Sequence, residues 1–149
     1  MTEATRAAVR RMHDSHKTAT LATTGEGGSW AATVFFASDA ELNLYFVSDR
    51  RTRHGRDLAA HREVAVAIHA DCQGWSAIRG LQIAGRAGVA DGRQRALGLA
   101  HYLAKFPDIK ALLEMPRSAE EQTIAERLKA ASLCCLTPRW VRLIDNRAP

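Results

Sequence analysis

The chain has 149 residues, of which 46% are hydrophobic and 25% charged, the composition of a single globular domain spanning residues 1–149. No window approaches the roughly 20 apolar residues of a membrane-spanning helix. The N-terminus is too polar for a secretory signal, so we expect a cytoplasmic protein with no membrane partner. The net charge of +5 is scattered along the chain and aromatic residues make up only 6%, which argues against a nucleic-acid partner.

The N-terminal half consists of short runs that alternate between apolar and polar residues. An amphipathic helix is expected over residues 2–16. The linkers at 25–28 and 38–41 are rich in Gly, Ser and Asp, as tight hairpin turns require. These patterns predict antiparallel strands at residues 18–23, 30–37 and 42–48.

The C-terminal half continues this β pattern but contains two helices. A short helix over 56–61 precedes the strand expected at 63–69, and glycines inside the strand expected at 78–89 indicate bends. Asp91 caps a helix that Pro107 stops, and Ser118 with Glu121 forms the capping box of another. The strands expected here are 63–69, 78–89, 132–137 and 140–144. The sequence therefore predicts a mainly β domain of the α+β class, with about six antiparallel strands and peripheral helices.

The cysteines and histidines indicate no metal site or reactive pair. Cys134 and Cys135 are adjacent in an apolar run, so they should point to opposite faces of a strand as core thiols. His13 and His16 share a helix face, but no carboxylate or thiol converges with them. No Walker loop or dinucleotide glycine fingerprint is present. We expect no metal, and the catalytic residues stay unassigned.

Basic residues gather where the strand at 42–48 ends. Thr52, Arg53 and His54 offer hydroxyl and cationic donors together, which is what a phosphate monoester needs. In the alternative interpretation, Thr52 is the N-cap of a helix and the cations lie on a solvated face. Cations oppose the dipole at a helix N-terminus, so an anion would stabilise this arrangement.

Several short motifs occur in the order typical of one family. They are ATLAT at 19–23, LYFVS at 44–48, TRH at 52–54 with Leu58, and VAV at 64–66. With them, the chain resembles the pyridoxamine-5'-phosphate-oxidase-like, FMN-binding split-barrel superfamily. IRGLQ at 78–82 with Gly85, and Tyr102 with Phe106 and Pro107, are similar to an uncharacterised bacterial branch of it.

The resemblance implies a homodimer of six-stranded antiparallel split β-barrels with FMN at the interface. Thr52, Arg53 and His54 would then hold the flavin phosphate. The strand residues expected beside the cofactor are Thr33, Val34, Phe35, Phe46, Val47 and Ser48. Trp75 is expected either to line the cofactor site or to cover an edge of the core. Gln82 is expected either to hydrogen-bond edge atoms of the flavin or to face solvent.

Three positions depart from the oxidase pattern. His54 stands where the oxidase has lysine, and Thr33 with the two alanines before it stands where the oxidase has an arginine that grips phosphate. The oxidase's C-terminal arginine and histidine have no equivalent beyond Trp140 and Arg142. Oxidation of pyridoxamine phosphate itself is therefore not expected.

The sequence thus favours an FMN-dependent oxidoreductase of unspecified substrate. The main alternative is a non-catalytic module that binds flavin or haem, since His54, His61 and His69 make haem ligation conceivable. A deazaflavin presents the same phosphate and flat ring as FMN, so it stays open as a cofactor. A third alternative is a structural dimer whose cofactor site has decayed, which the missing arginine favours.

Overall fold

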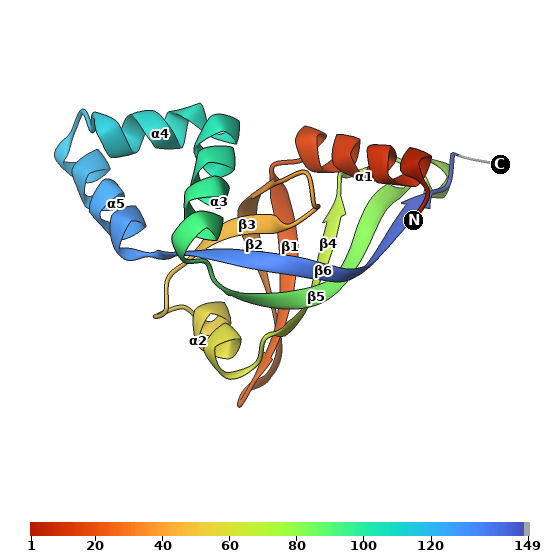
Figure 1. Cartoon of the computed structure of the whole chain (residues 1–149), viewed down its shortest axis with the longest axis horizontal. Coiled ribbons are helices and arrows are strands. Elements are labelled where there is room, and N and C mark those ends of the chain that lie inside the picture. Colours follow the sequence, from red (N-terminus) through yellow and green to blue (C-terminus); the bar gives the residue numbers. More distant parts are fainter. Residues whose placement is uncertain (148–149) are drawn as a thin grey trace.

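The computed structural model describes residues 1–147 and contains a closed barrel in the strand order β1–β2–β3–β6–β5–β4 (Figure 1). Every neighbouring pair is antiparallel, which confirms the expected six-stranded barrel. The strands are β1 (Thr18–Gly25), β2 (Gly28–Ser38), β3 (Leu44–Ser48), β4 (Glu63–His69), β5 (Arg79–Val89) and β6 (Ser132–Asp145). The helices are α1 (Glu3–Ser15), α2 (Arg53–Ala60), the short 3-10 helix η1 (Trp75–Ala77), α3 (Gly92–Lys105), α4 (Pro107–Glu114) and α5 (Ala119–Ala130).

The strands place alternate side chains inside and outside the barrel, and β3 is covered on both sides. Leu44 and Phe46 belong to the interior core, whereas Tyr45 and Val47 pack outside it against residues of α3 and β6. Cys134 and Cys135 are buried in these two different clusters, so the prediction that they face opposite sides of a strand is confirmed.

Helices cover both ends and one wall of the barrel. Val9 and Met12 of α1 fill one end, and Leu58 of α2 enters the core from the other (Figure 1). Helices α3, α4 and α5 lie between β5 and β6 in the chain, and Tyr102 and Phe106 pack on the outer wall. Within residues 1–147, no helix has the length and apolar character needed to cross a membrane.

Several expected boundaries were wrong, among them the start of α2, which begins at Arg53 instead of residue 56 because Thr52 caps the helix. Leu42 lies in a turn with φ 68°, so β3 begins at Leu44 instead of residue 42. Pro107 ends α3 but also opens α4, a helix that the sequence did not predict, because proline suits the first position of a helix. The two strands expected at 132–137 and 140–144 are one strand, β6, with an irregular register near Pro138.

The Asp39 carboxylate explains the sharp turn before β3. It accepts hydrogen bonds from the backbone N–H groups of Glu41 and Asn43, at 2.9 and 3.0 Å, and from the Tyr45 hydroxyl at 2.7 Å. Burial alone would raise the pKa of Asp39, but bonds from Asn43 and Tyr45 outweigh it and lower the pKa. These bonds hold Leu42 in the left-handed region, which residues other than glycine seldom adopt.

His13 is a buried histidine on the inner face of α1. Its side chain is fully buried, and neither ring nitrogen has a hydrogen-bond partner in the described structure. The ring meets the edge of Phe36 at 5.9 Å between centroids. Burial, and then the charge of Lys105, lower the pKa of His13 to about 4, against a weaker opposing effect of Asp39.

We predict that His13 makes the protein acid-sensitive. Above pH 6.5 the imidazole is neutral in both folded and unfolded states, but between pH 6.5 and about 4 only the unfolded state takes up a proton. The free energy of unfolding should therefore fall by up to roughly 3 kcal/mol over this interval. Urea denaturation of wild type and His13→Leu at several pH values measures the effect. The variant should lose this part of the pH dependence; parallel curves for the two proteins would contradict the prediction.

Candidate ligand cavity on the outer barrel wall

A cavity of about 420 Å³ lies where β2, β3 and the start of α2 face helix α5, and we call it the outer cavity. It brings together six of the eleven residues predicted from the sequence: Thr33, Val34, Phe35, Val47, Thr52 and His54. The remaining lining residues are Asp49, Tyr102, Ile124, Arg127, Leu128 and Ala131. Its volume is in the range of small-molecule sites.

The lining of the outer cavity combines apolar and polar parts. Phe35 and Val47 from the barrel and Ile124 and Leu128 from α5 supply apolar surface that suits a flat ring. Phe35 is 51% exposed, a high value for a phenylalanine. Thr52 and His54 at the start of α2, with Arg127, supply groups that suit an anion.

Thr52 caps helix α2, as one of the two interpretations of the sequence expected. Its Oγ1 accepts a hydrogen bond from the Gly55 N–H at 3.1 Å and donates one to the Asp49 carbonyl at 2.6 Å. The hydroxyl is thus committed to the helix cap. The first N–H groups of α2 have no acceptor within the helix, and together with the helix dipole they favour an anion beside them.

His54 contributes a half-buried imidazole to the cavity. Burial lowers the pKa of His54, against an opposing effect of the Asp57 charge. The ring is therefore neutral at pH 7, and its Nε2 lies 3.5 Å from Thr52 Oγ1. A neutral imidazole can accept a proton in the presence of a phosphate or ligate a metal ion.

Arg127 is a cation in the cavity that the sequence did not indicate. It reaches the outer cavity from α5, far along the chain from the predicted phosphate residues. The acidic residue there, Asp49, is bound by Arg51 through contacts of 2.6 to 3.1 Å, and these hydrogen bonds lower the pKa of Asp49 to about 2. Since Asp49 is paired with Arg51, the positive charge of Arg127 is not balanced by the one carboxylate that lines the cavity.

Helix α2 is fixed to the β1–β2 hairpin at two points. The buried Thr23 hydroxyl donates to the buried Asp57 carboxylate at 2.8 Å. Arg53 donates to the Gly27 carbonyl at 2.8 Å, and its guanidinium lies 4.3 Å from the centre of the Trp30 ring. The side chain of Arg53 therefore contacts the hairpin and does not line the outer cavity.

The other predicted residues lie elsewhere. Phe46 is 2% exposed in the barrel core, and Ser48 points to the barrel interior and lines a different cavity. Trp75 is exposed on η1, and Gln82 is exposed on β5 between its strand neighbours Ala67 and Arg142. Within residues 1–147, no three His, Cys, Asp or Glu side chains are grouped to hold a metal ion.

The strand order and the cavity on its outer wall define the chain as a small antiparallel barrel with a cavity outside the barrel. Residues 1–145 match the family model described as Pyridoxamine 5'-phosphate oxidase. The chain belongs to this family, which confirms the resemblance seen in the sequence.

Several individual proteins are similar to this chain in sequence or in structure. The chain is 31% identical over 88 residues to the UPF0306 protein YhbP of Salmonella paratyphi A, and the match covers 58% of this chain and 60% of that protein. The heme binding protein of Mycobacterium smegmatis has a similar structure, with a TM-score of 0.75, 22% identity, and coverage of 100% of this chain and 57% of that one. HutZ, the heme storage protein of Vibrio cholerae, also has a similar structure, with a TM-score of 0.69 and 17% identity; the match covers 93% of this chain and 92% of HutZ. At these identities the two structures establish the fold.

We predict that the hydrogen bond from Thr23 to Asp57 stabilises the position of α2. Thr23→Val keeps the shape of the side chain but leaves a buried carboxylate without this donor, so the free energy of unfolding should fall by about 1–3 kcal/mol. Urea denaturation measures the loss. Thr24→Val, on the exposed face of the same strand, is the matched control and should change stability little. Equal stabilities of the two variants would contradict the assignment.

Proposed function

We propose that the outer cavity binds FMN and that the protein is a flavin-dependent oxidoreductase. One observation carries the proposal: six residues expected beside a flavin, from three separate segments of the chain, line a single cavity. The family membership supports the same cofactor.

The lining residues suit the two chemically different parts of FMN. The start of α2 with His54 and Arg127 would hold the phosphate, whose charge would also raise the pKa of His54 and favour its protonation. Phe35, Val47 and Leu128 would pack on the ring. Arg53 would act indirectly, by holding the hairpin against α2. A bound flavin supplies hydride or electron transfer, while the chain binds it, orients it and excludes water.

A second copy of the chain is the proposed cover of the outer cavity. Phe35 in its wall is 51% exposed, and Trp30 on the same strand is 42% exposed. Large apolar side chains exposed near a ligand site are typical of an interface. We therefore propose a homodimer with the cofactor at the interface, as the resemblance implies.

Haem binding is the second candidate function. The observation that favours it is His54, a half-buried imidazole that burial keeps neutral, in the wall of the outer cavity. Neutral imidazole is the form that ligates haem iron. The haem-binding protein of M. smegmatis and HutZ share this fold, which keeps a haem-binding module as the alternative to a flavoenzyme.

Visible absorption spectra of the purified protein distinguish these functions. The protein is measured alone, after FMN and after haemin, each followed by removal of excess ligand. Flavin bands at about one equivalent per chain would support the first proposal, and NAD(P)H-dependent bleaching would indicate turnover. A Soret band that His54→Ala alters would support haem instead. A colourless protein that retains neither ligand would overturn both functions.

We predict that Arg127 contributes to phosphate binding. Arg127→Ala should weaken FMN affinity roughly tenfold, because a charge-assisted hydrogen bond at a partly solvated site is lost. Fluorescence titration of FMN measures the change. Lys129→Ala removes the same charge from an exposed position of α5 outside the cavity and should leave the affinity unchanged. Equal losses in both variants would point to a general charge effect and contradict a specific role.

A further inference from the structure

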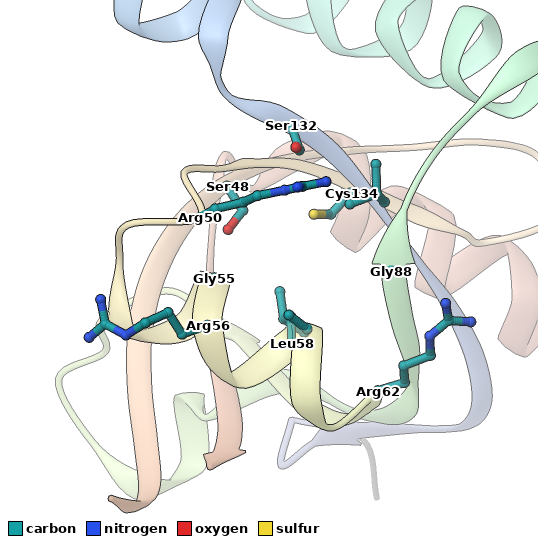
Figure 2. A pocket seen from close by; sticks show the side chains of 11 residues that line it. Ser48, Arg50, Gly55, Arg56, Leu58, Arg62, Gly88, Ser132 and Cys134 are labelled. Atoms are coloured by element: carbon teal, nitrogen blue, oxygen red, sulfur yellow. The ribbon is translucent and has the colours of Figure 1, made fainter. Parts of the chain in front are cut away.

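A second cavity, of about 460 Å³, lies on the opposite side of β3, and we call it the inner cavity (Figure 2). Helix α2 forms one side of this cavity, and the ends of β3, β5 and β6 form the other side. Its lining residues are Ser48, Arg50, Gly55, Arg56, Leu58, Ala59, Arg62, Gly88, Val89, Ser132 and Cys134. It shares no lining residue with the outer cavity, because Val47 and Ser48 point to opposite faces of β3.

Ser48 has a buried hydroxyl that is not hydrogen-bonded. The residue is 4% exposed, and its Oγ has no partner within the described structure. The side chain points into the inner cavity (Figure 2). Burying a hydroxyl without a partner is unfavourable, so the Ser48 hydroxyl is available to donate a hydrogen bond to a molecule bound in this cavity.

Two arginines make the inner cavity electropositive. Arg50 extends across its upper side toward Cys134, and Arg62 lies at the far side next to Gly88 (Figure 2). In the part of the chain that the structure describes, neither guanidinium forms an ion pair, and no carboxylate lines this cavity. Arg56 is different, because its guanidinium turns outward and bonds the Arg51 carbonyl.

The rest of the lining is apolar or neutral. Leu58 and Ala59 of α2 and Val89 of β5 supply the apolar part of the lining. Burial raises the pKa of the Cys134 thiol to about 11, so the thiol is protonated and adds no negative charge. The inner cavity therefore combines two unpaired cations and an unused hydroxyl with apolar side chains.

We propose that the inner cavity binds a small organic phosphate monoester. Ser48 Oγ–H and the Arg50 guanidinium would donate to the phosphate oxygens, and Arg62 would balance the second negative charge. The apolar part of the ligand would pack on Leu58 and Val89. Two guanidinium groups without a carboxylate match a dianion better than a singly charged carboxylate. This site is separate from the proposed cofactor site and does not depend on it.

Calorimetric titration with phenyl phosphate tests the proposal, because this probe joins a dianionic phosphate to an apolar ring. The wild-type protein should bind it, and Ser48→Ala and Arg50→Ala should each weaken binding at least tenfold. Arg11→Ala, which removes an exposed arginine from α1 at the opposite end of the barrel, should bind like wild type. Ser48→Ala removes only an unpartnered hydroxyl, so it should unfold at the same or higher urea concentration, which separates lost binding from lost folding.

Other outcomes would overturn the proposal. Absence of binding to the wild-type protein would do so, as would equal affinity for benzoate, which lacks the second charge. Binding that Arg127→Ala abolishes and Ser48→Ala leaves intact would place the probe in the outer cavity. Equal weakening by Arg11→Ala would show a general attraction to a basic protein instead of a site.

Discussion

The alternation of side chains along β3 determines where ligands can lie in this protein. This five-residue strand is covered on both sides, so Val47 faces the outer cavity and Ser48 faces the inner one. Helix α2 follows β3 directly and forms a wall of both: its first residues face the outer cavity, and Leu58 faces the inner one. The bond from Thr23 to Asp57 fixes this helix to β1, and a small displacement of α2 would change both cavities at once.

Much of the fold followed from local patterns. The alternation within strands and the turn residues between them predicted about six antiparallel strands, the family resemblance indicated that these strands form a barrel, and the capping motif at Ser118 located α5. The errors came from residues with two possible roles. Pro107 ends one helix and begins another, and Pro138 is accommodated by an irregular register inside β6 instead of breaking it. Leu42 fits a strand by composition, but the bonds to Asp39 hold it in a turn.

The site was less predictable, because a cavity is made by segments that are distant in the sequence. The family motifs identified Thr52 and His54, which lie together at the start of α2. They did not indicate Arg127, because only the folding of α5 back onto the barrel brings this residue to the cavity. A motif also cannot show the direction of a side chain. Arg53 was predicted with its neighbours Thr52 and His54 yet contacts Trp30, and the predicted residue Phe46 packs in the core.

The position of β6 in the barrel has a consequence for synthesis on the ribosome. This strand pairs with β3 on one side and β5 on the other, although the three helices α3 to α5 separate it from β5 in the chain. While the nascent chain still lacks β6, β3 and β5 each have an open edge that can pair with another chain. The apolar residues of the half-formed barrel are then also uncovered, so the chain is most exposed to aggregation in this interval.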